Sequence, residues 1–362
     1  MHTMRFIRFN LLIVIISFVA GNASFAEPIE KLKIGAILPL TGEAASIGTS
    51  ARNGMELALR KLKPEVRERI EVHFADDALQ AKVTVTEFNK LVEHEQVQVV
   101  FNISSGTGNA ISPLAERSRI PLVACASDPK VVEGRKYVVN FFVSPEQQAK
   151  TLVPYLTGQG LKSVARITSI QDGLLAQKKA IDEENAGRIR LVLDEEYPVT
   201  EKDFRTYIAK LRSRGDIDGV VALLLTGQVG TFAKQLRQAG FDKPIIGSET
   251  YEDTNEVTVS ENALVGARYV NSDDPLGTFV KEYSEAYPGA SIVFGPYGHD
   301  VILLLAQGME QGVEPEQLNK YLHTVSNFTG ALGTYSATND NRFSLPAVMK
   351  EVTTKGFQKL HH

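Results

Sequence analysis

Short apolar segments alternate with segments of helical periodicity along most of the chain. An unbroken apolar run is typical of a strand buried on both faces, whereas apolar residues three and four apart indicate the buried side of a helix. In the first part of the chain this pattern predicts strands at Lys33–Leu38, Ile70–Ala75, Gln98–Ile103 and Ile120–Ala126, and helices at Ala51–Leu62, Ala81–His94 and Thr107–Ser118.

The same alternation restarts after Pro145. It predicts strands at Ser163–Ile167, Arg190–Glu195, Gly219–Leu225 and Pro244–Gly247, and helices at Gln147–Leu156, Leu174–Asn185, Phe204–Arg212 and Thr231–Ala239. The C-terminal part adds predicted helices at Gly277–Tyr287, Tyr297–Gly312 and Pro315–Val325, then a turn and short strand at Gly330–Ser336. Apolar strands separated by helices indicate parallel sheets covered on both faces. For 362 residues, two doubly wound α/β lobes fit better than one very wide sheet.

The first 26 residues have the pattern of a secretory signal peptide. Arg5 and Arg8 make the start positive, and Leu11–Ala20 is apolar except for one serine. Ser24 and Ala26 then supply the small residues of a cleavage site, so we predict cleavage after Ala26 and export to the periplasm. The alternative is an uncleaved membrane anchor, but the apolar run is shorter than the ~20 residues that span a bilayer.

Charge and cysteine content exclude several classes of protein. The chain carries 39 Lys and Arg against 43 Asp and Glu, which argues against nucleic-acid binding because that function needs a basic surface. One cysteine, Cys125, allows neither an intrachain disulfide nor a cysteine-cluster zinc site. We therefore expect no nucleic-acid partner and no metal.

Motifs for catalysis and cofactor binding are missing. The chain has no P-loop, HExxH or GxSxG sequence, and Gly106–Ile111 lacks the third glycine of a dinucleotide fingerprint. His299 and Asp300 are neighbours on a predicted helix, where we expect their side chains to point in different directions. Cys125 could be a nucleophile, but a lone cysteine in an apolar run is more often a packed small residue. We expect no catalytic residue and no cofactor.

Ligands of open parallel sheets bind beyond the carboxyl ends of the strands, near helix N-termini. Ser104, Ser105 and Ser127 lie at such strand ends, where their hydroxyls either bind a carboxylate or cap helices and turns. Glu249 follows another predicted strand. Its carboxylate fits two roles, the partner of a ligand ammonium group or a solvated acid in a loop.

Five strings resemble one family in order and spacing: KIGAILPLTGEAASIGTSARNGMELAL, SSGTGNAISPLAERSRIPLVACASDP, EKDFRTYIAKLRSRGDID, FAKQLRQAGFDKPIIGSE and FTGALGTYSATNDNRF. The family is the leucine/isoleucine/valine-binding group of type I periplasmic binding proteins, the substrate-binding components of amino-acid ABC importers. The resemblance implies two Rossmann-like lobes joined by a hinge of three crossings. Lobe 1 would comprise 27–143 and 272–333, and lobe 2 would comprise 144–271 and 334–362.

The resemblance also assigns roles at the ligand site. Ser104 matches a serine that contacts the ligand carboxylate, Cys125 a backbone contact, and Ser127 a hydroxyl position. Glu249 matches the acid that pairs with the ligand's α-ammonium group. The predicted ligand-binding residues are Ser104, Ser105, Cys125, Ala126, Ser127, Thr226 and Glu249.

Three positions depart from the branched-chain pattern. The tyrosine that helps to bind the ammonium group falls at Leu225, beside Thr226, and the aromatic position of the first loop falls at Ile47. A second tyrosine position falls near Asp172. The carboxylate half of the site is therefore kept, whereas the halves that bind the amine and the side chain are altered.

The resemblance implies a monomeric extracytoplasmic protein that captures a small amino acid or related carboxylate and delivers it to ABC permease subunits in the inner membrane. The alternative is a ligand-sensing regulatory subunit of the same fold. An enzyme is the third possibility, and no motif in the sequence supports it.

Overall fold

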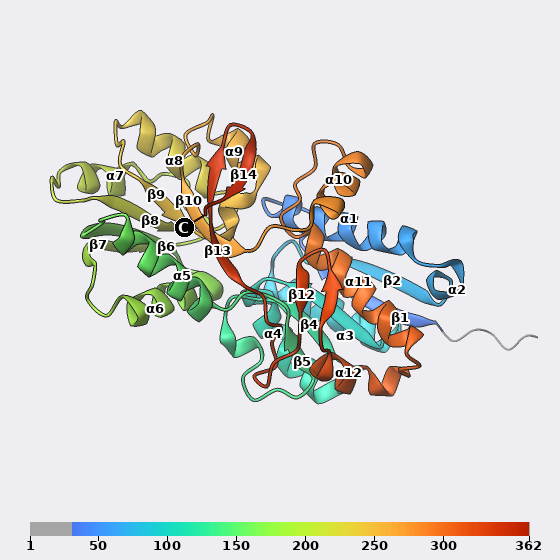
Figure 1. The fold of residues 1–362 in the computed structure, drawn as a ribbon. Helices are drawn as coiled ribbons and strands as arrows, with labels where there is room; N and C mark the ends of the chain where they lie inside the picture. Colours follow the sequence, from blue (N-terminus) through green and yellow to red (C-terminus); the bar gives the residue numbers. More distant parts are fainter. Residues whose placement is uncertain (1–30, 362) are drawn as a thin grey trace, which may run out of the picture. The chain divides into compact units, whose positions relative to one another are not determined.

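A computed structural model describes residues 31–361, and the predicted signal peptide at 1–26 lies outside the described residues. The chain builds two large sheets with helices against both faces of each (Figure 1). We call the sheet of β1–β5 with helices α1–α4 and α10–α12 lobe 1. We call the sheet of β6–β10, β13 and β14 with helices α5–α9 lobe 2.

Lobe 1 has a five-stranded sheet in the order β2-β1-β3-β4-β5, in which every neighbouring pair is parallel. Its strands are β1 (Leu32–Leu38), β2 (Ile70–Asp76), β3 (Val99–Ile103), β4 (Leu122–Cys125) and β5 (Val138–Asn140). Its helices are α1 (Ala45–Lys61), α2 (Pro64–Arg67), α3 (Ala81–Glu93), α4 (Ser105–Ser118), α10 (Gly277–Ala286), α11 (Gly295–Glu310) and α12 (Leu318–Thr324), with 3₁₀ turns η1 (Pro129–Val131) and η3 (Pro315–Gln317). A hairpin of β11 (Phe328–Gly330) and β12 (Gly333–Tyr335) packs beside α11.

Lobe 2 has a seven-stranded sheet in the order β14-β13-β10-β9-β8-β6-β7. Its strands are β6 (Ser163–Ser169), β7 (Arg190–Tyr197), β8 (Gly219–Leu223), β9 (Ile245–Gly247), β10 (Arg268–Ser272), β13 (Ala347–Thr353) and β14 (Gly356–Lys359). Its helices are α5 (Pro145–Gly158), α6 (Asp172–Asn185), α7 (Arg205–Arg212), α8 (Val229–Gln238) and α9 (Thr254–Val259), with the 3₁₀ turn η2 (Glu249–Glu252).

Both sheets are buried on both faces, as their apolar strands predict. In β1, Ile34 and Ala36 pack with α1 and α11, whereas Ile37 packs on the opposite face with α3 and α4. In β8, Val220 and Val221 likewise belong to cores on opposite faces. The cores therefore hold each sheet between two helical layers and leave the strand ends available for a site.

The two lobes repeat one topology. The order β2-β1-β3-β4-β5 in lobe 1 matches the order β7-β6-β8-β9-β10 in lobe 2, and all these neighbours are parallel. In this doubly wound order, the connections from β1 and β3 leave toward opposite faces of the sheet. A crevice therefore opens at the carboxyl ends of those strands, and the same holds for β6 and β8.

The chain passes between the lobes three times. It leaves lobe 1 after β5, returns after β10 to form α10–α12, and leaves again between β12 and β13 (Figure 1). This is the two-lobed α/β fold with three crossings that the sequence predicts.

One detail of the prediction is wrong. The sheet of lobe 2 is mixed rather than wholly parallel, because β13 pairs antiparallel with β10 and β14 pairs antiparallel with β13. The segment Gly330–Ser336 contains the predicted turn and short strand, and that strand, β12, pairs with β11 in a hairpin. The sequence analysis also missed β5, β10, β13, β14 and α9.

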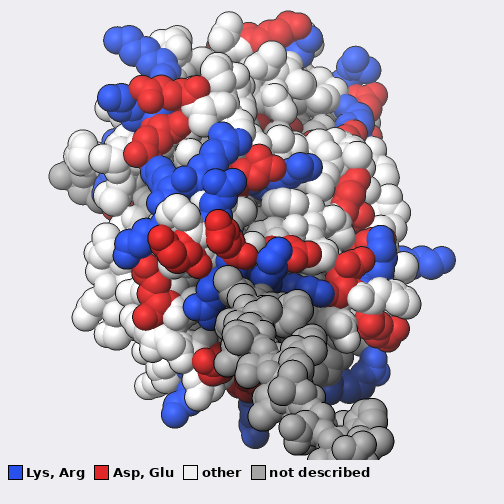
Figure 2. All heavy atoms as spheres, turned by 90° about the vertical axis from the view of Figure 1, so that its right-hand side faces the viewer, with Lys and Arg blue, Asp and Glu red and all other residues white. Residues whose placement is uncertain are grey.

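None of the helices in residues 31–361 has the length and apolar character that crossing a bilayer requires. Within the same range, no group of three or more His, Cys, Asp or Glu side chains is arranged to hold a metal ion. On the face that Figure 2 draws, Lys and Arg side chains lie interspersed with Asp and Glu side chains.

Candidate functional site

A cavity of about 60 Å³ lies between the carboxyl ends of the two sheets. Side chains from both lobes line it, with apolar groups, hydroxyls, an amide and a single carboxylate among them. The lining consists of Ile47, Leu79, Ile103, Ser104, Ser105, Cys125, Ser127, Phe142 and Phe294 from lobe 1, and Gln171, Gly173, Leu174, Leu225, Glu249 and Thr250 from lobe 2. The cavity thus occupies the crevice where the topology predicts a ligand site.

Ser104 sits at the junction of β3 and α4 with a strained backbone. Its φ of 99° and ψ of 142° lie in a region that residues with a side chain rarely adopt, at a cost of about 1–3 kcal/mol. Its side chain does not cap α4. Its hydroxyl instead accepts a hydrogen bond from Gln171 Nε2 of lobe 2 at 3.4 Å. The strained junction therefore presents this hydroxyl to the cavity rather than to the helix.

The other two predicted serines also make contacts different from helix caps. Ser105 Oγ accepts a hydrogen bond from the backbone N–H of Asp128 at 3.0 Å and so fixes the loop after β4. Ser127 Oγ donates to Glu249 Oε1 across the cleft at 3.4 Å. The structure thus brings all three hydroxyls to one cavity. None of them caps α4, although Ser105 retains a structural contact with the loop after β4.

Glu249 is buried and is not a solvated loop acid. It begins the 3₁₀ turn η2 directly after β9, with only 9% of its surface exposed. Burial raises the pKa of its carboxyl group, although hydrogen bonds from its own backbone, Gln177, Ser248 and Ser127 oppose that shift. Within residues 31–361, Glu249 forms no ion pair with a Lys, Arg or His side chain. Its negative charge is therefore uncompensated by a cation of the described chain.

The sequence analysis missed two glutamines of lobe 2. Gln171 caps α6, because its Oε1 accepts from the N–H groups of Gly173 and Leu174, and its Nε2 reaches Ser104. Gln177, on the next turns of α6, donates from Nε2 to Glu249 Oε2 at 2.8 Å. Gln171 follows the predicted strand Ser163–Ile167, and its position near a strand end is the signal that could have identified it. No local pattern marks Gln177.

The remaining predicted residues have different surroundings. Cys125 lines the cavity, and its thiol donates to the Phe141 carbonyl at 3.1 Å while burial raises its pKa well above the normal value. Ala126 lies outside the lining, and the Asn140 side chain bonds both its N–H and its C=O. Thr226 is buried, also lies outside the lining, and its hydroxyl has no hydrogen-bond partner among the described residues.

Two of the three departures from the branched-chain pattern face the cavity. Ile47 and Leu225 both line it and add apolar surface where the pattern has aromatic side chains. Asp172 lies outside the lining, and its carboxylate accepts a hydrogen bond from Asn109 Nδ2 at 3.0 Å.

The two lobes contact each other around the cavity. At its rim, Lys202 of lobe 2 pairs with Glu43 of lobe 1 at 2.6 Å, and Ser46 donates to Asp253 at 2.6 Å. At Gly173, a Cβ atom would lie 2.6 Å from Ser105 Oγ, so only glycine permits this approach of the lobes. The structure is therefore closed over the cavity.

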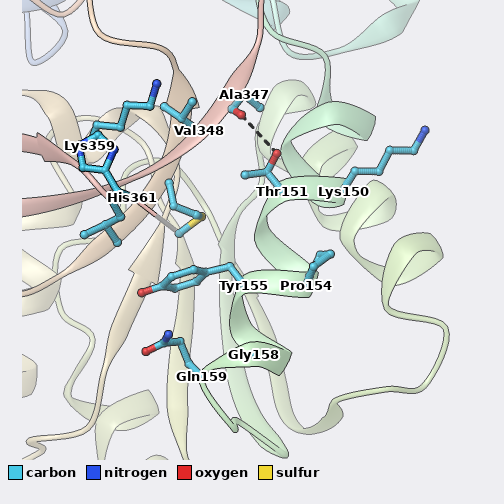
Figure 3. A pocket seen from close by; sticks show the side chains of 12 residues that line it. Lys150, Thr151, Pro154, Tyr155, Gly158, Gln159, Ala347, Val348, Lys359 and His361 are labelled. Atoms are coloured by element: carbon cyan, nitrogen blue, oxygen red, sulfur yellow. Dashed lines mark hydrogen bonds between the residues drawn. The ribbon is translucent and has the colours of Figure 1, made fainter.

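A larger groove of about 860 Å³ runs between α5 and β13 in lobe 2 (Figure 3). Its cations do not converge: Lys150 points away from the other labelled side chains, and Lys359 pairs with Asp273 at 2.7 Å. No buried charge faces this groove, so we assign the candidate site to the smaller cavity between the lobes.

His299 and Asp300 contact each other, contrary to expectation. His299 Nδ1 lies 2.9 Å from Asp300 Oδ1, and both side chains are buried. Asp300 also accepts hydrogen bonds from Leu332 N at 3.0 Å and from the Tyr335 hydroxyl at 3.3 Å. The pair therefore ties α11 to the hairpin of β11 and β12, and neither residue lines the cavity.

The cavity combines two kinds of polar group. The N-terminus of α4 points its first N–H groups toward the region of Ser104, and the helix dipole makes that end positive. Lobe 2 contributes the buried carboxylate of Glu249. No Lys, Arg or His belongs to the lining. Such a site can hold a molecule with an anionic end bound by neutral donors and a cationic end bound by a carboxylate.

Comparisons with known proteins agree with this geometry. A sequence model of the family described as periplasmic binding protein matches residues 31–357. The chain is 26% identical over 339 residues to Leu/Ile/Val-binding protein homolog 3 of Brucella melitensis, covering 88% of this chain and 90% of the relative.

Solved structures share the fold at lower sequence identity. A leucine-binding protein of Thermotoga maritima matches with a TM-score of 0.85 and 20% identity, over 91% of this chain and 98% of that protein. An ABC-transporter solute-binding protein of R. palustris, solved with benzoate, matches with a TM-score of 0.82 and 21% identity, over 91% and 95% of the two chains.

Proposed function

This chain belongs to the periplasmic binding protein family, and from that premise we propose that it captures a small amino acid between its lobes and delivers it to an ABC importer. In this proposal the chain is exported to the periplasm with cleavage after Ala26. It acts as a monomer, binds its ligand without chemical change, and presents the closed form to permease subunits in the inner membrane. The first two hinge crossings lie near 143/144 and 271/272. The third lies between β12 and β13 rather than at the expected 333/334, because Tyr335, Phe343 and Leu345 still pack in the core of lobe 1.

The observation that carries the proposal is the buried charge of Glu249. Burying a carboxylate without a cation is costly, and proteins normally pair or neutralise such a group. Glu249 receives hydrogen bonds from Gln177 and Ser127, but no cation of the described chain reaches it. A ligand ammonium group supplies the missing positive charge, and this favours an amine-bearing ligand.

The opposite side of the cavity supports an anionic ligand group. Ser104 offers its hydroxyl, and the free N–H groups at the start of α4 are aligned by the helix dipole. Hydrogen bonds from such donors to a charged acceptor contribute about 1.5–3 kcal/mol each. A zwitterion matches both sides of the cavity at once.

The size and apolar part of the cavity favour a small ligand. The cavity has a volume of about 60 Å³, which favours a small ligand over a large one. Leu225 and Ile47 supply aliphatic surface beside Glu249, and Phe294 supplies an aromatic face. These contacts suit an amino acid with a short apolar side chain.

An aromatic carboxylate is the second candidate, because a protein of the same fold was solved with benzoate. The rings of Phe142 and Phe294 lie 5.8 Å apart and stacked, and both line the cavity. Benzoate-like ligands have no cation for Glu249, however, and would bring a second negative charge toward it. We therefore favour the amino acid.

A thermal-shift screen tests the proposal. The purified protein is heated with single amino acids, with the corresponding des-amino carboxylates, and with benzoate and its hydroxylated derivatives. A ligand at 100 times its Kd stabilises the protein by about 2.7 kcal/mol, which is a clear shift in Tm. We expect shifts from one or a few small amino acids. Shifts confined to carboxylates without an amine would contradict the proposal.

Uptake measurements separate transport from sensing. Cells that lack the gene should lose high-affinity uptake of the amino acid found in the screen, and the restored gene should return it. Normal uptake together with a lost transcriptional or behavioural response would instead support the ligand-sensing alternative.

A further inference from the structure

Gln177 is a buried glutamine whose amide faces the carboxylate of the site. It projects from α6 with 2% of its surface exposed, and its Nε2 donates to Glu249 Oε2 at 2.8 Å. The same Nε2 lies 3.4 Å from Ser127 Oγ, which in turn donates to the other oxygen of Glu249. Three elements from both lobes thus meet at one carboxylate.

The amide oxygen of Gln177 takes no part in these hydrogen bonds. Oε1 is buried and has no hydrogen-bond partner among the described residues. A buried acceptor without a donor is costly, so native proteins seldom keep one without a reason. Here the amide is oriented so that Nε2 donates to Glu249, and this orientation leaves Oε1 without a donor. The unsatisfied acceptor therefore results from the contact that holds the carboxylate.

We propose that Gln177 is a positioning residue for amine recognition: its Nε2 holds the carboxylate of Glu249 in the orientation that meets the ligand ammonium group. This proposal rests on the proposed function. Leu225 has only apolar atoms, so the orientation of Glu249 depends on its hydrogen bonds with Gln177 and Ser127.

Among the described residues, the charged group nearest to Glu249 along the chain is Glu252 of the same turn, which is ion-paired with Lys350. Gln177 faces it from α6, Ser127 from the loop after β4, and Ser248 from its own strand end. Tyr297 of α11 and Cys125 of β4 are the nearby titratable groups, and burial raises the pKa of both well above the normal values. Both are neutral at physiological pH, so the acid limb of ligand binding reports on Glu249.

The test uses the full mature protein and the amino acid that the screen identifies, with its des-amino carboxylate as the reference ligand. Calorimetry compares wild type, Gln177→Met and Gln177→Asn between pH 4 and 8. Met removes both amide atoms, and Asn withdraws them by one methylene group. Gln148→Met is the matched control, because Gln148 is equally buried and also has an unpartnered Oε1, whereas its Nε2 donates to the Val143 carbonyl at 3.4 Å and not to Glu249.

We expect both Gln177 variants to bind the amino acid about tenfold or more weaker and the des-amino carboxylate within about twofold of wild type. The acid limb should also move to higher pH, because loss of the Nε2 donor makes the ionised form of Glu249 less favourable. Gln148→Met should match wild type in both respects. Unchanged amino-acid affinity, or equal losses for both ligands, would overturn the proposal and leave the proposed function standing.

A titration of the ligand-free protein keeps the two proposals apart. Carbon-13 NMR of labelled glutamate carboxyls, with Glu249 assigned by its loss in Glu249→Gln, should show a higher pKa for Glu249 in Gln177→Met than in wild type. An unchanged pKa overturns the positioning role of Gln177. If wild type binds no amino acid, the proposed function fails, whereas this titration still measures whether Gln177 holds the carboxylate of Glu249.

Discussion

Two buried glutamates begin and end the same 3₁₀ turn, η2, and differ in one respect. Glu252 lies 3.0 Å from Lys350 Nζ through both of its oxygens and accepts a hydrogen bond from Asn271 Nδ2 at 2.7 Å. Lys350 also pairs with Asp274 at 2.9 Å. Glu249, three residues earlier, has neutral hydrogen-bond partners only.

The Glu252 charge has a structural role. Lys350 is only 1% exposed, and although burial alone would lower its pKa, the carboxylates of Glu252 and Asp274 outweigh that effect and raise it. The network anchors the C-terminal end of η2 to β13 and to the crossing after β10. Glu249, at the other end of the turn, has no cationic partner among the described residues, which fits the proposed role in binding.

Removal of Lys350 should give the largest loss of stability. Lys350→Met turns Glu252 into a second buried carboxylate without a cation, and breaking such a pair costs about 3–5 kcal/mol. Urea unfolding followed by circular dichroism measures the change. As the matched control, Lys359→Met removes a partly exposed pair with Asp273 and should cost less than about 1 kcal/mol. Equal losses for the two variants would mean that the buried network is no more important than a surface pair.

The hydroxyl side of the cavity should give the next effect. Ser104→Ala removes one donor to the ligand carboxylate and should weaken binding about tenfold or more, since such bonds contribute about 1.5–3 kcal/mol. Calorimetry with the amino acid measures this. Ser112→Ala in the same helix α4 is the control, because Ser112 is buried but lies outside the lining. Loss of affinity in both variants would point to damage to α4 rather than to a contact.

The smallest expected effect is a gain in the stability of the ligand-free protein. Burial raises the pKa of Glu249, so ionisation of its carboxyl group opposes folding. The ligand-free protein therefore keeps its full free energy of unfolding below the unfolded pKa of this group, about 4.3. It becomes less stable as pH rises through the folded pKa. Glu249→Gln removes this loss. It should raise Tm at pH 7, by roughly 2–4 °C for each kcal/mol relieved, and have little effect near pH 4. A lower Tm at pH 7 would show that the carboxylate stabilises the empty protein.

Local patterns predicted most of the fold because the central parallel strands, among them β1, β3 and β8, are largely apolar. They failed at β10 and β13. β10 contains Arg268 and Asn271, and β13 contains Lys350, so neither has an apolar run. The charges of β13 are satisfied by Glu252 and Asp274, which are distant in sequence. A tertiary ion network of this kind has no local signature.

The site shows the same limit. Strand ends and the family resemblance placed Ser104, Ser127 and Glu249 at one cavity, since the carboxyl ends of parallel strands share an edge. The role of Gln177 could not be predicted, because its value lies in a 2.8 Å contact across 72 positions of sequence. The absence of a cation beside Glu249 is likewise a property of the folded lobes, not of any segment.

The binding of a ligand cation by Glu249 is central to the proposed function. Calorimetry with one matched pair of ligands tests it directly. The amino acid found in the screen and its des-amino carboxylate are titrated into wild type and Glu249→Gln at pH 7. Because loss of one partner of a buried pair costs about 3–5 kcal/mol, the variant should bind the amino acid at least 100-fold more weakly. Its affinity for the des-amino carboxylate should be unchanged or higher. The opposite result is a wild-type protein that prefers the des-amino carboxylate and a Glu249→Gln variant that binds this carboxylate with the same affinity. It would contradict the claim that Glu249 binds a ligand ammonium group.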